Sequence, residues 1–202
     1  MNDISQYLKV RSQIRPGDVI VFAGNALISR AIDVFGGSKI THCGIVRQGV
    51  HGTSEVLLSE STIENGKSGA QTNPLGARLA DYGDGAKAWW LPLSDEVHKL
   101  IDWEGFYKAV GAADGIVKYD IPGLFGFLAR SVPVIGPRIC QTENQRQMVC
   151  SGYVCHVFEG CGVLRGVNYN KITPQDVVEM SLYRQCVQLI GKPGNITRFN
   201  TV

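Results

Sequence analysis

The sequence predicts a single α+β domain built around an antiparallel sheet. Apolar runs rich in β-branched residues are interspersed with helical patterns, without a regular strand–helix–strand alternation. Two β-prone runs are also joined by a short polar connection with two glycines, which favours a hairpin. With 202 residues, 44% of them hydrophobic, the chain is long enough for one buried core and short for two. We therefore expect one domain over residues 1–202, with 1–15 forming an N-terminal helix or arm.

The first half of the chain supplies most of the expected strands. A β-branched run predicts a strand over 18–22, and apolar residues at helical spacing predict a helix over 25–35. The hairpin strands are expected over 41–46 and 55–61. The following segment, 62–86, is rich in Gly, Ser, Asn and Thr and shows little periodicity, which predicts a long surface loop.

The second half alternates strands and capped helices. A strand is expected over 87–93, and Ser94 followed by two acidic residues predicts a helix that runs to about residue 112. A compact helix is expected over 151–160. Thr173 and Pro174 predict the start of a helix that continues through Met180, because proline suits the first helical position. A strand over 183–190 follows.

Charge and hydropathy exclude several classes of partner. The net charge of +2 gives no electrostatic reason to expect nucleic acid. The most apolar region, 121–136, is interrupted by Arg130 and two prolines, and no apolar stretch reaches the roughly 18 residues of a membrane span. The N-terminal residues show no basic segment followed by an apolar run. We therefore expect a cytoplasmic protein without an integral membrane segment.

Six cysteines are present, and their spacing does not favour metal binding. No pair has the two-residue gap of a zinc knuckle, and a chain of this length does not need disulfides. Most of these thiols are expected to be small buried hydrophobes. The sequence therefore predicts neither a metal nor a cofactor.

Cys150 differs from the other cysteines because it immediately precedes a predicted helix. It lies four residues before Val154, on the same apolar stripe. The N-terminal end of a helix carries partial positive charge and N–H groups without intrahelical partners, which favour a thiolate. These N–H groups also suit an oxyanion. Cys150 is therefore a candidate nucleophile.

A cysteine nucleophile needs a base, which is normally a histidine. His156 lies six helical residues from Cys150, a rise of about 9 Å, and it points to another face. His51 falls in the hairpin turn and His98 in the first turn of a helix, where solvent exposure is expected. His42, at the start of a strand, is the remaining candidate.

Hairpin pairing supplies a third member. If the turn centres on His51, His42 lies directly opposite Glu60, with Cβ atoms about 4.5–5.5 Å apart. Glu60 is then expected to accept a hydrogen bond from one imidazole nitrogen and orient the ring, so that the other nitrogen serves the thiol. A register shift of one residue would place Glu60 on the other face of the sheet.

These residues, in their sequence contexts, resemble a known family. The matching segments, in order, are Pro16–Ile20, Ile40–Val46, Leu57–Glu60, Tyr119–Asp120, Val149–Ser151 and Thr173–Asp176. Together they resemble the permuted papain-like hydrolases related to NlpC cell-wall peptidases, and in particular the YiiX-like members. The resemblance implies a circularly permuted papain-like fold in which an antiparallel sheet packs against the helix that bears the nucleophile. It also implies a Cys-His-Glu set made of Cys150, His42 and Glu60.

Three functions follow from these expectations. The first is a cysteine hydrolase that cleaves an amide bond, of a peptide or peptidoglycan-type substrate, through an acyl-thioester. The second is a lipid acyl hydrolase or acyltransferase on the same three residues, which would act on a lipid amide or ester; the apolar segment 121–136 motivates it. The third is a non-catalytic, thiol-rich binding domain.

Overall fold

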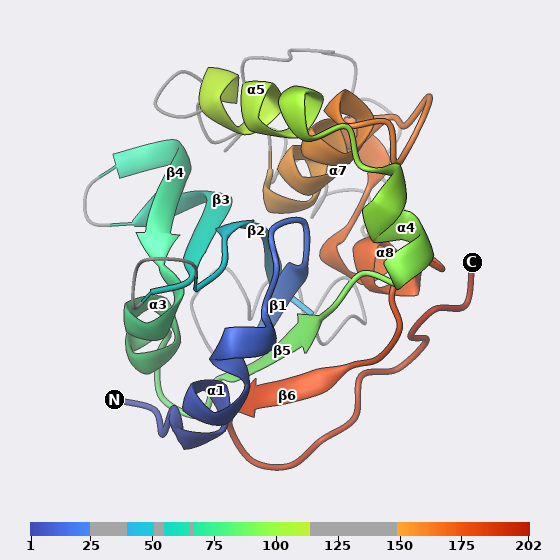
Figure 1. Ribbon diagram of the computed structural model, residues 1–202. Coiled ribbons are helices and arrows are strands. Elements are labelled where there is room, and N and C mark those ends of the chain that lie inside the picture. Colours follow the sequence, from blue (N-terminus) through green and yellow to red (C-terminus); the bar gives the residue numbers. More distant parts are fainter. Residues whose placement is uncertain (25–39, 51–54, 65–66, 114–148) are drawn as a thin grey trace, which may run out of the picture.

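The computed structural model describes residues 1–24, 40–50, 55–64, 67–113 and 149–202. Within these ranges the chain forms a six-stranded antiparallel sheet of order β4-β3-β2-β1-β5-β6, with helices against both faces (Figure 1). The strands are β1 (Val19–Ala23), β2 (His42–Gln48), β3 (Leu57–Glu64), β4 (Lys67–Pro74), β5 (Lys87–Leu91) and β6 (Val187–Ile190). The helices are α1 (Ser5–Val10), α3 (Leu75–Asp81), α4 (Asp95–Leu100), α5 (Trp103–Ala113), α7 (Cys150–Gly160) and α8 (Pro174–Glu179), with 3₁₀ turns at Arg11–Gln13 and Tyr169–Lys171.

The sheet separates two apolar cores. Along β1, Val19 and Val21 face one core, whereas Ile20 and Phe22 face the other, as the two-residue period of a strand requires. Helices α5, α7 and α8 pack on the first face, and α1 and α3 pack on the second (Figure 1). The antiparallel sheet between helices confirms the expected mixture of strands and helices.

The β2–β3 hairpin forms, but in a different register from the one expected. Ile45 pairs with Ser59 and Val46 with Leu58, which shifts β3 by two residues relative to the prediction that placed His42 opposite Glu60. A shift of two residues preserves the face on which each side chain lies. The turn prediction centred on His51 lies in residues 51–54, outside the described residues, and a bulge between Val46 and Gln48 also alters the pairing.

The prediction of a surface loop over 62–86 is wrong. Strand β3 continues to residue 64, β4 pairs with it along its whole length, and α3 follows directly. Strand β4 is an edge strand with the sequence KSGAQTNP, which contains few β-branched or aromatic residues. Backbone pairing with β3, rather than side-chain propensity, therefore holds this segment in the sheet.

The helix predicted over 94–112 is divided into α4 and α5. Ser94 caps α4 as expected, because its hydroxyl accepts a hydrogen bond from the Val97 N–H. Ile101 is buried and has an extended backbone, which ends α4. The Asp102 carboxylate then accepts from the Glu104 N–H and caps α5. Asp102 was thus assigned to a helix interior, although aspartate is a strong N-cap residue.

The remaining elements agree with expectation to within a few residues. Helix α7 begins at Cys150, and a capping box between Thr173 and Asp176 starts α8. Strand β6 is shorter than the expected 183–190, although Tyr183 forms an isolated bridge with Leu93. The predicted helix over 25–35, the pair Tyr119–Asp120 and the apolar segment 121–136 lie outside the described residues. Among the helices in the described ranges, none has the length and apolar character needed to cross a bilayer.

Candidate active site

Cys150 is the first residue of α7 and packs against the sheet. Its side chain belongs to the core cluster of the α7 face and is only 4% exposed. Val149 has an extended backbone and precedes the helix without a side-chain cap. The thiol therefore lies in the first turn of an 11-residue helix, where the helix dipole favours a negative charge.

His42 lies at the start of β2 and is buried against an aromatic pair. Its ring centroid lies 5.6 Å from that of Phe22 and 6.3 Å from that of Tyr82, and these two rings stack on each other. The Nε2 atom of His42 lies 2.5 Å from Oε2 of Glu60, which is fully buried in β3. This contact leaves Nδ1 as the ring nitrogen available to another partner.

Gly44 allows this diagonal contact between His42 and Glu60. A Cβ at Gly44 would lie 3.0 Å from the Leu58 side chain and 3.1 Å from the Cβ of Glu60. The two β3 side chains therefore occupy the space beside β2 that a larger residue would fill. Because Gly44 has no side chain, Glu60 can approach the imidazole two residues away on the same face.

The electrostatics of Cys150 and His42 favour a thiolate–imidazolium pair. The pKa of Cys150 is well below its ordinary value, because hydrogen bonds from the Cys43 thiol and from His42, together with the His42 charge, outweigh burial. Burial alone would lower the pKa of His42, but Cys150 and Glu60 raise it to about 9. The two opposite shifts favour negative charge on the sulfur and positive charge on the ring.

Two further side chains hold the Glu60 carboxylate. Oε1 of Glu60 accepts hydrogen bonds from Nε of Arg78 at 2.8 Å and from Nδ2 of Asn73 at 3.0 Å. Burial alone would raise the pKa of Glu60, but contacts with His42 and Arg78 lower it to about 2. The Arg78 guanidinium also lies 4.8 Å from the centroid of the Tyr82 ring, which fixes its position. Glu60 is thus an ionised, fully hydrogen-bonded carboxylate behind the imidazole.

Cys43 is a second thiol at the site. It follows His42 in β2 and is fully buried, and burial raises its pKa well above the ordinary value. The raised pKa favours a neutral thiol at Cys43, and its interaction with the Cys150 sulfur lowers the pKa of Cys150. The Cys43 backbone N–H also interacts with that sulfur and lowers the pKa of Cys150.

The other described cysteines and histidines have different surroundings. Burial raises the pKa of Cys155 to about 12 and that of Cys186 to about 11, and burial also raises the pKa of Cys161. The His98 ring lies 5.0 Å from that of Trp103, and the His156 ring lies 5.8 Å from that of Tyr169. Within the described ranges, Cys150 is thus the cysteine with a lowered pKa.

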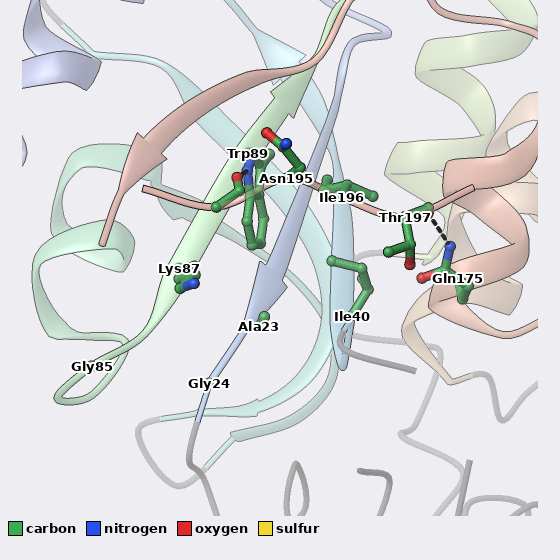
Figure 2. Close-up of a pocket in the computed structure, with 11 residues that line it drawn as sticks. Ala23, Gly24, Ile40, Gly85, Lys87, Trp89, Gln175, Asn195, Ile196 and Thr197 are labelled. Carbon is green, nitrogen blue, oxygen red and sulfur yellow. Dashed lines mark hydrogen bonds between the residues drawn. The ribbon is translucent and has the colours of Figure 1, made fainter. Parts of the chain in front are cut away.

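A pocket of about 340 Å³ lies at the C-terminal end of β1 (Figure 2). Trp89 of β5, Ile40 and Ile196 provide apolar walls (Figure 2). Polar groups line the rest: Lys87, Gln175, Asn195 and Thr197. Ile40 also belongs to the core cluster that contains Cys150, and it precedes His42 by two residues. The pocket therefore lies on the α7 face of the sheet, at the end where β2 begins.

The sequence analysis missed Arg78, Asn73 and Cys43 as members of this site. Asn73 and Arg78 lie in the segment that was expected to be a loop, where no register placed them near Glu60. Cys43 adjoins His42 in the chain, but strand alternation assigns adjacent side chains to opposite faces. The packing of α7 against β2, which couples Cys150 with Cys43 and His42, is a tertiary feature without a local sequence signal.

Comparisons with known proteins relate the fold of the chain to one described protein. No family model matches the sequence. No curated protein matches it significantly. Five solved chains match the structure, among them the crystal structure of the metalloprotein YiiX from Escherichia coli O157:H7. That structure is 20% identical, has a TM-score of 0.50, and the match covers 76% of this chain and 69% of that chain. The chain therefore has a YiiX-like fold.

Proposed function

We propose that the protein is a cysteine hydrolase with a permuted papain-like catalytic domain, which cleaves an amide bond in a peptide or peptidoglycan-type substrate. The His42–Glu60 contact, together with the electrostatic coupling of His42 to Cys150, supports this proposal. The three groups come from α7, β2 and β3, and their charges match the thiolate–imidazolium–carboxylate arrangement that nucleophilic catalysis requires. The histidine, acid, cysteine order also fits the permuted papain-like hydrolases that the sequence resembles.

The proposed reaction proceeds in two steps. The Cys150 thiolate attacks the amide carbonyl carbon, and N–H groups in the first turn of α7 stabilise the resulting oxyanion. The His42 imidazolium gives its proton to the departing amine as the C–N bond breaks, which leaves an acyl-thioester. Neutral His42 then takes a proton from water, which attacks the thioester. Cleavage of the C–S bond releases the acid and restores the thiolate–imidazolium pair.

Metal chemistry is not part of this proposal, although the related YiiX structure is described as a metalloprotein. Among the described residues, no group of three or more His, Cys, Asp or Glu side chains is arranged to hold a metal ion. The side-chain atoms that could bind a metal already have other partners. Nε2 of His42 contacts Oε2 of Glu60, and Nε of Arg78 donates to Oε1 of Glu60. A cation beside Glu60 would be repelled by Arg78. The residues present therefore do not fit a metal centre.

The two alternative functions have less support. The lipid hydrolase or acyltransferase was motivated by segment 121–136, which lies outside the described residues. A non-catalytic thiol-rich domain gives no reason for one thiol to differ from its neighbours. Burial raises the pKa of Cys155, Cys161 and Cys186, whereas that of Cys150 is lowered.

The test combines site-selective labelling with turnover. Iodoacetamide at pH 7 is expected to alkylate Cys150 faster than every other thiol, as followed by peptide mass spectrometry. Cleavage of a peptidoglycan-derived peptide is expected to disappear in Cys150→Ala but to persist in Cys155→Ala, another buried cysteine of α7 that serves as the matched control. Equal labelling of all thiols, or unchanged cleavage in a folded Cys150→Ala variant, would falsify the proposal.

A further inference from the structure

Lys87 supplies the charge of the pocket at the C-terminal end of β1. It lines the pocket together with Trp89, two residues further along β5 (Figure 2). Among the lining residues that the structure describes, none is acidic. Among the ion pairs in the described parts of the chain, none includes Lys87. The pocket therefore has a positive charge without a carboxylate partner from the described residues.

The Lys87 ammonium group lies close to Gly194. A Cβ built on Gly194 would lie 2.8 Å from Nζ of Lys87, so the ammonium occupies space that a side chain would fill. Gly194 lines the pocket as well, and its carbonyl accepts a hydrogen bond from the Trp89 indole. The charged end of Lys87 thus lies at the pocket wall, close to the edge of the Trp89 ring.

The remaining lining divides into apolar and polar parts. Trp89 is almost fully buried, and Ile40 and Ile196 face it across the pocket (Figure 2). The Gln175 amide donates to the Thr197 carbonyl and closes the far side (Figure 2). A ligand with an anionic group beside an apolar group matches this combination, because an ammonium and a carboxylate form a charge-assisted hydrogen bond.

The pocket lies near the chain position of His42. Ile40, which lines the pocket, is two residues from His42, and two residues of extended chain span at most roughly 7 Å. We propose that the pocket binds a carboxylate-bearing part of the substrate, with Lys87 as its counter-ion. This inference rests on the proposed function.

The first test measures binding at the pocket itself and requires no turnover. The probes are N-acetylphenylalanine, which carries a carboxylate, and N-acetylphenylalaninamide, which does not. The indole N–H signal of Trp89, assigned through Trp89→Phe, is followed in ¹⁵N NMR spectra. We expect the acid to bind about fivefold more tightly than the amide. Lys87→Gln should abolish this difference and Lys87→Arg should retain most of it, whereas exposed Lys108→Gln should leave it unchanged.

The second test connects the pocket with the thiol. Saturating N-acetylphenylalanine is expected to slow the alkylation of Cys150 by iodoacetamide in the wild type, and to slow it much less in Lys87→Gln. Equal affinity for acid and amide, or an acid preference that survives in folded Lys87→Gln, overturns the assignment of Lys87. Binding at Trp89 without any slowing of alkylation overturns the placement of the pocket next to the reacting atoms.

Failure of this inference is distinguishable from failure of the proposed function. If Cys150 reacts no faster than the other thiols, the proposed hydrolase is wrong whatever the probes do at Trp89. If Cys150 is selectively reactive but the two probes bind alike, the hydrolase proposal stands and the carboxylate pocket is wrong.

Discussion

Glu60 contacts the His42 imidazole diagonally across the β2–β3 ladder, through an Nε2–Oε2 distance of 2.5 Å, rather than from the directly opposite position. The diagonal contact depends on Gly44, whose missing side chain lets Glu60 lean toward His42. The carboxylate is anchored from behind by Arg78 and Asn73. The protonation state of the imidazole therefore depends on residues of β3, β4 and α3.

Glu60→Gln is expected to lower the pKa of His42. Burial favours the neutral ring, and Glu60 is one of the groups that raise this pKa to about 9. Without the carboxylate charge the imidazolium loses its proton at lower pH. NMR titration of the His42 ring checks this shift, and the upper limb of the pH–rate profile should move down with it. The same pKa of His42 in both proteins would contradict the assigned role of Glu60.

Cys43→Ala is expected to raise the pKa of Cys150. The variant removes the thiol whose hydrogen bond is the largest cause of the lowered pKa, and it leaves the backbone N–H in place. The pH dependence of iodoacetamide alkylation measures the shift. Cys43→Ser keeps a donor and should shift the profile less, whereas Cys155→Ala should not shift it. Identical profiles for Cys43→Ala and the wild type would show that the thiol has no such effect.

Arg78→Met is expected to destabilise the protein by about 3 kcal/mol, because it leaves the buried Glu60 carboxylate without its guanidinium partner. The side chain of Arg78 is 9% exposed. Urea denaturation measures the loss. Asp95→Asn provides the control: Asp95 is 56% exposed and its partner Arg15 is 32% exposed, so loss of this pair should cost less than about 1 kcal/mol. Similar losses in the two variants would argue against the network around Glu60.

The contacts of Glu60 with His42 and Arg78 also predict how the free energy of unfolding changes in acid. The pKa of Glu60 is about 2 in the folded protein and about 4.3 for an unperturbed glutamate in an unfolded chain. Its ionised form therefore stabilises the fold above pH 4.3, and this contribution is lost as the pH falls toward 2. The free energy of unfolding, measured between pH 5 and pH 2, should decrease with acid in the wild type. In Arg78→Met the Glu60 contribution to that decrease should be smaller.

Asp18 has the opposite pH dependence. Burial raises its pKa to about 6, although it accepts hydrogen bonds from the Trp90 indole and from the backbone N–H groups of Arg15 and Leu93. A raised carboxyl pKa contributes stability below the unfolded value of about 3.9, and this contribution is lost as the pH rises through 6.

Asp18→Asn tests this assignment. The variant should lose the Asp18 titration and should cost about 1–3 kcal/mol, because an amide NH₂ would face one of the three donors. Urea denaturation followed by tryptophan fluorescence at several pH values measures both effects. A pH dependence equal to that of the wild type would show that Asp18 does not titrate in this range.

Local chemistry accounts for the elements that could be predicted from the sequence. Ser94 and the Thr173 capping box mark helix starts that the structure confirms, because capping residues act within one turn. The β-branched residues of β1 likewise predicted a strand. Strand β4 was missed because its polar sequence joins the sheet through backbone hydrogen bonds with β3, which leave no side-chain pattern.

The candidate site was predictable only in part. Cys150 and His42 were singled out from their positions at a helix start and a strand start, and their pKa shifts are coupled in the structure, whereas their catalytic roles stay a prediction. Glu60 was selected through a register that proved two residues off, and it lies on the expected face because an even shift preserves strand alternation. The contributions of Arg78 and Cys43 depend on the packing of α3 and α7, which no local pattern describes.

His42 and Cys150 are more than a hundred residues apart in the chain. The lowered pKa of Cys150 therefore depends on the long-range packing of α7 against β2. In an unfolded chain Cys150 is expected to be an ordinary thiol, protonated at neutral pH. The rate at which rapid alkylation of Cys150 returns after dilution from urea is therefore expected to report this packing.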